Sequence, residues 1–424
     1  MHRLPRGQLY FAPVVALRSA ARHLPRGWTA GRPVAELESA LAHRLGRAHA
    51  VLLPHARVGL HHVLQALGLN PGAEVATTPV TVPGMVQAIQ LAGLVPRFVD
   101  LGVQTANFDP TDLARQLSPA TAAILVTHLC GFAADLRAAT DLATASGLPL
   151  VEDGSQALGA SLDGRPIGAW GVAGVFSLST MKPVSSFHGG VVVTDDDALA
   201  REIRAVDAVF CRPPSRREAM TTVGGWLLRD HALHLATLPQ VFPMTWPFLR
   251  AAERWAPGAV DAAQRGRTPG RPSPVRMQRL LAVPDGWRRP YSDFQATLAL
   301  DALPKLDAGN ARRQELGLRL VDRLTAAGVA GTPVLLERSQ PVFWRFPLWV
   351  QDVPRFRSRL AAMGVDSGQT NLDCCSESAA FGGRPGLAPQ AASFVRDAVL
   401  LPMHPNLRAT DMDRIARAVL RSVS

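Results

Sequence analysis

The chain has 424 residues, 47% hydrophobic and 19% charged, which is ordinary for a globular protein and long enough for two domains. Its formal net charge is +11, but it carries no helix-turn-helix, zinc-finger or RNP-like signature, so we do not expect a nucleic-acid partner. Its four cysteines, Cys130, Cys211, Cys374 and Cys375, lack metal-ligand spacing, which argues against a metal site and favours the reducing cytoplasm.

The first 30 residues begin with basic side chains, and Arg18 and Arg22 interrupt their apolar run. No small-residue cleavage site follows. We therefore expect an ordered N-terminal arm and not a signal peptide.

Short apolar runs alternate with helical patterns from residue 47 to residue 195, among them "AVLLP", "AEVATTPV", "AAILVTHL", "LPLVED", "AGVFSLS" and "GGVVVTDD". Strands that alternate with helices need crossover connections, which predict an α/β fold with a mostly parallel, doubly wound sheet. Ligands bind such sheets outside the carboxyl ends of the strands. Three loops at these ends are candidates for one site: "PHARVG", "EDGSQALGA" and "STMKPVSSFHGG".

Lys182 is one of only two lysines, with Lys305, among 45 basic residues. A guanidinium stays protonated in proteins, whereas a lysine can become a neutral nucleophile, so we expect Lys182 to act as an amine. Asp153 ends an apolar strand, where a carboxylate is often only a helix cap. It has a functional role if it faces a cation such as the protonated pyridine nitrogen of pyridoxal phosphate (PLP). The phosphate of PLP could then bind the helix N-terminus near Arg57 and the hydroxyl of Ser177.

The alternating pattern breaks down between residues 204 and 289, where an apolar stretch at 232–249 precedes an arginine-rich flank. Pro239, Pro243 and Pro247 recur within that stretch, and each removes a helix hydrogen bond that lipid cannot replace. We expect this stretch to pack on the protein or on a dimer mate, in preference to a membrane-surface contact through residues 232–289.

Beyond this segment, a helical run at 293–324 and the pieces "VFWRFPLWV" and "RIARAVL" predict a smaller α+β domain. The predicted organisation is an N-terminal arm with a PLP-binding large domain (1–205), a Pro/Arg-rich insertion (206–290), and a linking helix with a small C-terminal domain (291–424).

The pattern Asp153-x-x-Gln156, followed by "IGAWGVAGVFSLSTMK" and "GGVVVTDD", resembles the DegT/StrS family of PLP-dependent aminotransferases. That family typically reads D-A-A-Q-A-x-G-A, then G-x-F-S-F-x-x-x-K, then G-E-G-G-x-x-x-T. The resemblance continues in "GWTAGRPVAELESALAHRLG", "LGLNPGAEVATTPVTVPG", "THLCGFAADL", "SDFQATLALDALPKLD" and "VLLPMHP". Only residues 204–289 lack an evident counterpart.

The resemblance implies fold type I and a homodimer with active sites at the subunit interface. It places Lys182 on the Schiff-base lysine, Asp153 on the partner of the pyridine nitrogen and Gln156 on the residue that bonds O3′ of the cofactor. Ser177 falls on a phosphate ligand. His128 falls on the histidine of the family's H-L-x-G strand end, whose role stays open.

The chain departs from the family pattern around the phosphate. His55-Ala56-Arg57 stands where the family has S-G-T. The backbone N–H groups of Ala56 and Arg57 can still bind a phosphate, and the Arg57 side chain can add a charge-assisted bond. Arg288 replaces the asparagine that, in the family, reaches the phosphate of the neighbouring subunit.

Two further departures concern the cofactor ring and the loop after the lysine. Val82 stands where an aromatic residue usually stacks on the pyridine, which loses a contact of roughly 0.5–1.5 kcal/mol. His188 replaces the glutamate of G-E-G-G. These changes leave the core chemistry possible but weaken the expectation of a sugar-nucleotide substrate.

The expected function is that of a cytoplasmic PLP-dependent aminotransferase. It would move an amino group from an amino acid, glutamate by the resemblance, to a keto or aldehyde group of a sugar nucleotide or related polar acceptor. Alternatives are a PLP-dependent dehydratase, whose branch of the family has histidine in place of the lysine, and a non-catalytic or lipid-associated descendant. Retention of Asp153, Gln156, Ser177 and Lys182 together favours the aminotransferase.

Overall fold

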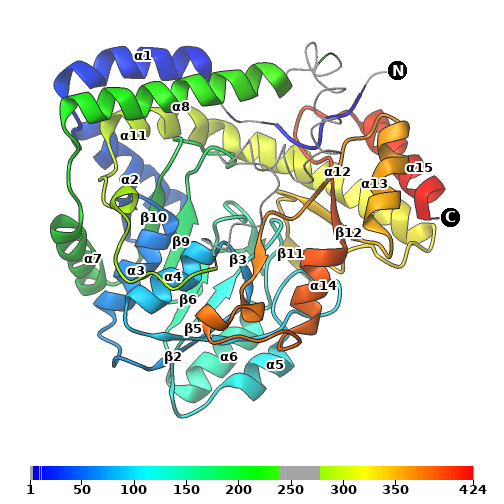
Figure 1. Cartoon of the computed structure of the whole chain (residues 1–424), viewed down its shortest axis with the longest axis horizontal. Helices are drawn as coiled ribbons and strands as arrows, with labels where there is room; N and C mark the ends of the chain where they lie inside the picture. Colours follow the sequence, from blue (N-terminus) through cyan, green and yellow to red (C-terminus); the bar gives the residue numbers. More distant parts are fainter. Residues whose placement is uncertain (1–2, 9, 11, 238–243, 245–276, 424) are drawn as a thin grey trace.

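The computed structural model describes residues 3–8, 10, 12–237, 244 and 277–423. In this part of the chain a seven-stranded sheet forms the centre of the large domain (Figure 1). Its strands, in spatial order, are β1 (His49–Leu53), β10 (Gly190–Thr194), β9 (Ala173–Ser177), β6 (Leu150–Asp153), β5 (Thr121–Thr127), β2 (Glu74–Thr77) and β4 (Val95–Phe98).

Six of these seven strands point the same way. β9, β6, β5, β2 and β4 pair in parallel, and β10 pairs antiparallel with both β9 and β1, so β1 has the direction of β9. The predicted mostly parallel sheet is confirmed. The carboxyl ends of β1, β5, β6 and β9 therefore lie along one edge.

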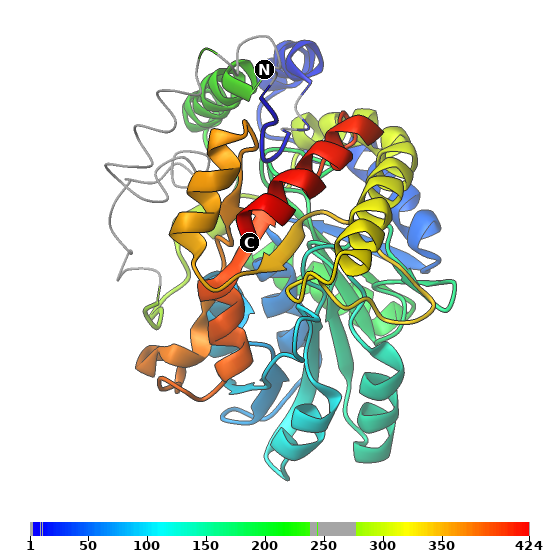
Figure 2. The ribbon, with the colours of Figure 1, turned by 90° about the vertical axis from the view of Figure 1, so that its right-hand side faces the viewer.

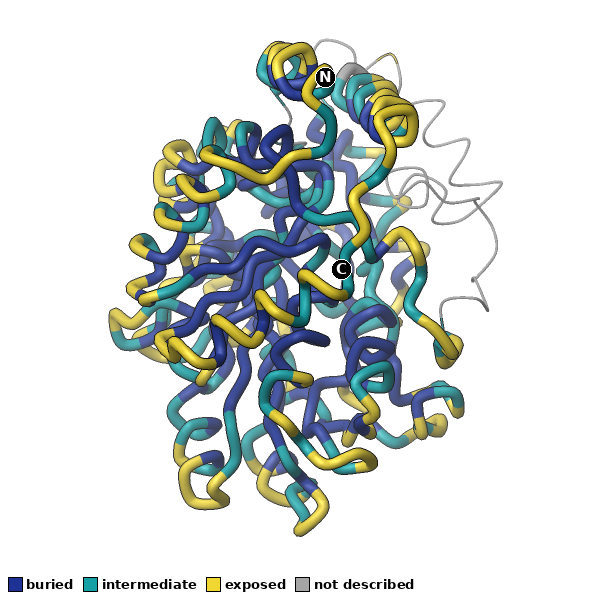
Figure 3. The backbone as a smooth tube through the Cα atoms, turned by 90° about the vertical axis from the view of Figure 1, so that its left-hand side faces the viewer, coloured by how far each residue is buried: buried dark blue, intermediate teal, exposed yellow. Residues whose placement is uncertain are grey.

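Helices cover both faces of the sheet, whose strands are almost entirely buried (Figure 3). One apolar cluster joins the sheet to α3 (Ala56–Ala66), α4 (Pro83–Leu91) and α7 (Asp197–Phe210). Two further clusters join it to α2 (Arg32–Leu45), α11 (Asp293–Ala302), α5 (Pro110–Gln116) and α6 (Leu136–Ser146). Aspartates that accept backbone N–H groups cap the N-termini of α5, α6 and α7.

The C-terminal part forms the predicted smaller α+β domain (Figure 2). Its antiparallel strands β12 (Phe346–Trp349), β15 (Ala398–Leu401) and β13 (Gly368–Gln369) pack with α13 (Val353–Ala362), α14 (Pro389–Asp397) and α15 (Ala409–Val423). The long helix α12 (Leu306–Ala326) shares this core. Two small sheets accompany these domains. One pairs β3 (Val80–Thr81) with β14 (Asp373–Cys374), and in the other β7 (Ser161–Leu162) lies between β8 (Arg165–Pro166) and β11 (Ser339–Gln340).

Two helices lie together at one end of the molecule, α1 (Pro13–His23) from the N-terminal arm and α8 (Arg216–Thr237) (Figure 1). α7 crosses the predicted boundary between residues 205 and 206, because no glycine or proline interrupts the chain before Pro213. The domain boundaries stay predictions. Pro239, Pro243, Pro247 and most of the arginine-rich flank lie outside the described residues, and within the described ones no helix has the length and apolar content needed to cross a membrane.

Candidate active site

Residues from three neighbouring strands meet at the carboxyl edge of the sheet. β5 ends just before His128, β6 ends at Asp153, and β9 ends at Ser177 and leads into the loop that carries Lys182. α3 starts at the same edge, because it follows β1, which runs in the same direction. The three loops that the sequence suggested thus lie together at the carboxyl edge of the sheet.

Lys182 is half-buried in a turn, where its backbone N–H donates to the carbonyl of Ser179 over 2.8 Å. Its Nζ lies 3.9 Å from the ring centroid of Trp344, and the Trp344 indole N–H donates to the carbonyl of Met181 over 3.1 Å. Burial lowers the pKa of Lys182 to about 7, Asp153 opposes that change, and Arg345 adds to it. An amine with this pKa is largely available as a nucleophile near neutral pH.

Asp153 is 4% exposed at the tip of β6, and its Oδ1 accepts the backbone N–H of Ser155 over 2.9 Å. Burial raises the pKa of this carboxyl, while Ser155, Lys182 and His128 act in the opposite direction. A buried carboxyl whose ionised form is disfavoured gains from a cationic hydrogen-bond donor. The site therefore suits the protonated nitrogen of a pyridine.

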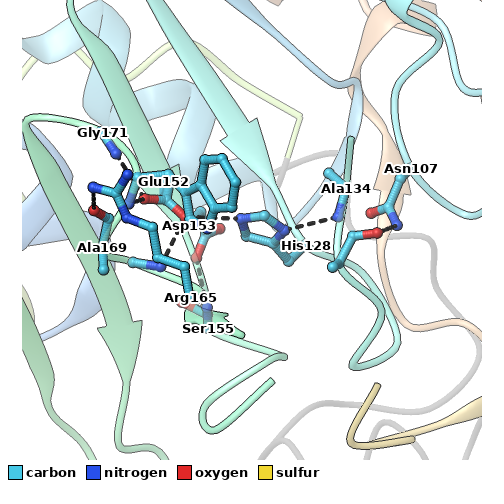
Figure 4. A network of polar contacts seen from close by, with 12 residues as sticks. Asn107, His128, Ala134, Glu152, Asp153, Ser155, Arg165, Ala169 and Gly171 are labelled. Atoms are coloured by element: carbon cyan, nitrogen blue, oxygen red, sulfur yellow. Dashed lines mark hydrogen bonds and ion pairs between the residues drawn. The ribbon is translucent and has the colours of Figure 1, made fainter. Parts of the chain in front are cut away.

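A buried network connects Asp153 to the interior (Figure 4). His128 Nδ1 accepts the backbone N–H of Ala134 over 3.0 Å, and its Nε2 lies 3.4 Å from Oε2 of Glu152. Glu152 is fully buried and accepts three backbone N–H groups, from Gly168, Trp170 and Gly171. Because Nδ1 is an acceptor, the imidazole proton is on Nε2, toward Glu152. The ends of β5 and β6 are joined by the backbone, where the His128 N–H donates to the Asp153 carbonyl over 3.0 Å.

The opposite end of the site offers groups for a phosphate. The first turn of α3 has backbone N–H groups without intrahelical acceptors, and His55 at the N-cap contributes no capping bond. A Cβ at Gly190 would lie 2.3 Å from the Ala56 nitrogen, so the close approach of β10 to the start of α3 requires glycine at 190. Ser177 Oγ lies 3.2 Å from Ser179 Oγ at the end of β9.

Arg57 and Val82 lie beside this helix N-terminus. The Arg57 guanidinium is 5.0 Å from the ring centroid of Trp287 and packs against Gly84 at the start of α4. Val82 is the N-cap residue of α4 and packs partly against the apolar cluster of α3 and α4. Both positions are consistent with a cofactor between α3 and α4.

Gln156 and Arg288 have partners elsewhere in the chain. Gln156 Oε1 accepts the backbone N–H of Cys130 over 2.9 Å, which leaves its amide N–H groups as possible donors to a cofactor oxygen. Arg288 Nη1 donates to the carbonyl of Phe210 over 3.3 Å, and its guanidinium lies 5.2 Å from that ring. The described contacts thus place Arg288 at the end of α7, and its contact with a neighbouring subunit stays a prediction.

His188 borders a cavity of about 380 Å³ with His55, Trp28, Trp226, Trp287 and Arg289. The rings of His55 and His188 meet edge to face at 5.3 Å. Burial lowers the pKa of His188 to about 4, so at neutral pH this side chain carries no charge. The position where the family motif has a negatively charged glutamate thus holds a neutral imidazole in this chain.

The sequence reasoning missed Trp344, Arg345 and Glu152. Trp344 lies against Nζ of Lys182, and the Arg345 guanidinium lies 4.6 Å from the ring centroid of Trp344. Both belong to "VFWRFPLWV", which the sequence pattern assigns only to the small domain. The signal that could have found them is an aromatic-arginine pair directly before an apolar strand. For Glu152 it is a charged residue inside the buried apolar run "LPLVED".

The residues present fit PLP. A lysine with a lowered pKa lies near a buried carboxyl, and the N-terminus of α3, which lacks a side-chain cap, is available for a phosphate. These three features match, in order, the aldehyde, the pyridine nitrogen and the phosphate of the cofactor.

Comparisons with known proteins identify the family and support the fold. The model of the DegT/DnrJ/EryC1/StrS aminotransferase family matches residues 17–227 and 278–420. DesV from S. venezuelae is 25% identical, with a TM-score of 0.73 over 99% of this chain and 98% of that chain. The sugar aminotransferase CalS13 from Micromonospora echinospora is 24% identical, with a TM-score of 0.73 over 98% of this chain and 99% of that chain. The dehydratase ColD has the same fold at 16% identity, with a TM-score of 0.72 over 98% of this chain and 100% of that chain.

Proposed function

The chain belongs to the DegT/DnrJ/EryC1/StrS aminotransferase family and is a PLP-dependent aminotransferase, and from this premise we propose that it aminates a keto group of a sugar nucleotide with glutamate as the donor. The observation that carries the proposal is the placement of Lys182 and Asp153 at the carboxyl edge of the sheet. Burial shifts the pKa of the lysine downward and that of the carboxyl upward.

When bound, PLP supplies an aldehyde that captures amines and a pyridine ring that accepts electrons. Asp153 would accept a hydrogen bond from the ring nitrogen and so keep that nitrogen protonated. Gln156 would donate to the ring oxygen O3′, while Ser177 and the N–H groups of Ala56 and Arg57 would hold the phosphate.

Lys182 performs the proton transfers in this proposal. Its Nζ is neutral near pH 7 to 8, so it can accept the proton from Cα of the amino acid donor and return a proton to another carbon. Trp344 lies against Nζ, and its bond to Met181 fixes the turn from which Lys182 extends. The lysine is thereby restricted to a narrow range of positions.

Several observations support a sugar acceptor. CalS13 is described as a sugar aminotransferase, and DesI, 23% identical to this chain, was solved with its TDP-sugar product. Basic residues at 57 and 345 near the site suit an anionic substrate. A homodimer, in which a second copy would bring Arg288 to the phosphate, is part of the same proposal.

The test uses holoenzyme, glutamate labelled with ¹⁵N, and a panel of 3-keto and 4-keto sugar nucleotides, with mass spectrometry of the sugar product. Transfer of ¹⁵N to one of these sugars, absent with Lys182→Arg, is the expected result. Loss of water from the sugar without ¹⁵N transfer would establish the dehydratase alternative. No reaction with any donor and acceptor, together with binding to lipid vesicles, would favour the lipid-associated descendant.

A further inference from the structure

The lysine loop, residues 178–189, is closed by its own backbone. Leu178 N donates to the Gly189 carbonyl over 2.9 Å, and Thr180 N donates to the Phe187 carbonyl over 3.0 Å. Lys182 lies at the turn between these paired segments. The position of its amine therefore depends on whatever holds Thr180 and Phe187.

The protein body supports one side of this loop. The Tyr291 hydroxyl donates to Ser186 Oγ over 2.8 Å, and Gln295 Nε2 donates to the His188 carbonyl over 2.7 Å. Both donors belong to the stretch at 278–420 that the family model matches. This support thus comes from the part of the chain that the family model covers.

α8 supports the other side through Thr180. The Thr180 hydroxyl donates to Asp230 Oδ2 over 3.1 Å and accepts from Arg229 Nη2 over 3.0 Å. The hydroxyl also lies 3.1 Å from the Phe187 carbonyl, but it has one proton, and that carbonyl already accepts the Thr180 N–H. The carboxylate is consequently the stronger acceptor for the hydroxyl proton.

Asp230, the residue that accepts the Thr180 hydroxyl, is a buried carboxylate. It is 1% exposed, and its other oxygen Oδ1 accepts from Arg229 Nε over 2.6 Å. A carboxylate with so little exposure needs both partners, because an unpaired buried charge is strongly destabilising. Asp230 and Arg229 both lie beyond residue 227, where the family match stops.

α8 makes a second contact with the loop through Phe187. This residue has a φ of 67°, a conformation that is unusual for a bulky side chain and persists only when its surroundings hold it. Its buried ring stacks on Trp226 of α8 at 5.7 Å and on Phe294 of α11 at 5.8 Å. Phe187 occupies the first glycine position of the G-E-G-G motif, so this chain has a packed aromatic ring where the family motif has glycine.

α8 is itself fixed to the body of the protein. Its Val223 is fully buried in the same apolar cluster, and Trp226 meets Trp28 edge to face at 6.1 Å. Trp28 in turn donates its indole N–H to the Pro290 carbonyl over 2.6 Å. Because α8 is held in place by these contacts, it can hold the lysine loop in place as well.

From these contacts we propose that α8 clamps the lysine loop, with Asp230 and Trp226 as positioning residues that hold Thr180 and Phe187 and so set the place of the Lys182 amine. The inference rests on the proposed function in that Lys182 is the reacting amine. It extends that function by assigning a role to α8. The C-terminal part of this helix, which includes Asp230, lies beyond the family match.

The clamp predicts how Lys182 titrates in the cofactor-free protein. Asp153 from β6 and Arg345 from the segment before β12 are the charged groups that act on Lys182, and no variant below changes them. If the clamp is released, the loop loosens and water reaches Nζ, which reduces the desolvation that lowers its pKa.

The measurement is trace acetylation of the cofactor-free protein over pH 6 to 11, quantified by peptide mass spectrometry. Because the chain has two lysines, Lys305 on the surface is an internal reference for Lys182. The midpoint is the pH at which acetylation of a lysine reaches half of its maximal rate. We expect the Lys182 midpoint to rise by at least about half a pH unit in Asp230→Ala, Thr180→Val and Trp226→Ala, with no change for Lys305.

Three matched variants separate positioning from general destabilisation. Asp230→Asn keeps an acceptor oxygen for Thr180 and should retain most of the wild-type midpoint. Leu228→Ala, at an exposed position of α8, and Asp141→Asn, at an exposed position of α6, should leave it unchanged.

An unchanged Lys182 midpoint in both Asp230→Ala and Thr180→Val would overturn the clamp. If Asp230→Ala does not fold, Thr180→Val decides, since it removes only a hydroxyl from a residue of the same shape. The labelling uses no cofactor, so a failure of the proposed function shows itself elsewhere, as a cofactor label on a residue other than Lys182 when the holoenzyme is reduced with borohydride and mapped.

Discussion

The rate at which the cofactor-free protein captures PLP should follow the titration of Lys182. Burial lowers the pKa of this amine to about 7 from an ordinary value of 10.5. At pH 8 roughly nine-tenths of the side chain would be neutral, against about 0.3% for an unperturbed lysine, which makes roughly 300 times more of the side chain available as the nucleophile. The rate should therefore rise with pH only up to about pH 7 and stay level above it.

Two substitutions should move the midpoint of this pH dependence, the pH at which the capture rate is half of its plateau, in opposite directions. Asp153 raises the pKa of Lys182, so Asp153→Asn should move the midpoint to lower pH. Arg345 lowers the pKa of Lys182, so Arg345→Met should move it to higher pH. Each shift should be on the order of half a unit to one unit. Arg417→Met, at an exposed position of α15, should leave it in place.

Stopped-flow absorbance after PLP is added at a series of pH values measures these midpoints. The midpoint is read from the shape of the profile, so a weaker affinity for PLP in Asp153→Asn does not disturb it. A wild-type rate that keeps rising tenfold per pH unit up to pH 10 would refute the reasoning. So would shifts of the same sign in the Asp153 and Arg345 variants.

Other residues lead to further expectations. Lys182→Arg should fold normally and lose transamination completely, since its guanidinium stays protonated, which a coupled assay at saturating PLP would detect. Glu152→Gln should lower the free energy of unfolding in urea by about 3 kcal/mol, because a buried amide cannot satisfy the three backbone N–H donors that the carboxylate accepts. The control Glu315→Gln, at an exposed position, should lower it by less than about 0.5 kcal/mol. Gly190→Ala should weaken PLP binding in a fluorescence titration, because its Cβ would press on the nitrogen of Ala56, and wild-type affinity would contradict that role for the helix N-terminus.

Much of the scaffold can be predicted from the sequence because the responsible signals are local. Short apolar runs that alternate with helical patterns require crossover connections, and these make the strands parallel. Their carboxyl ends then lie along one edge, which is why strand order and polarity are enough to assign Asp153 and Lys182 to one site. The scarcity of lysine draws attention to Lys182, and the family motifs supply its expected role.

The partners of these residues depend on chain segments far away in the sequence. Trp344 contacts Lys182 from the small domain, and Glu152 is satisfied only because the turn at residues 168–171 presents three N–H groups to it. No spacing or periodicity encodes such contacts, because they arise when separately formed elements pack together. The lowered pKa of Lys182 has the same origin, since burial by the assembled fold is its largest cause.

The contact of α8 with the lysine loop is the clearest case of a decision made by tertiary structure. In the sequence, residues 204–289 show only a broken pattern, and Asp230 is one charge in a run of mixed residues. The fold brings Asp230 to Thr180 and Trp226 to Phe187, across about 40 to 50 positions of the chain. The sequence by itself determined which residues could carry the chemistry, because side-chain type and strand order are local properties. Packing determined their ionisation and their positions, because both depend on which distant surfaces exclude water from them.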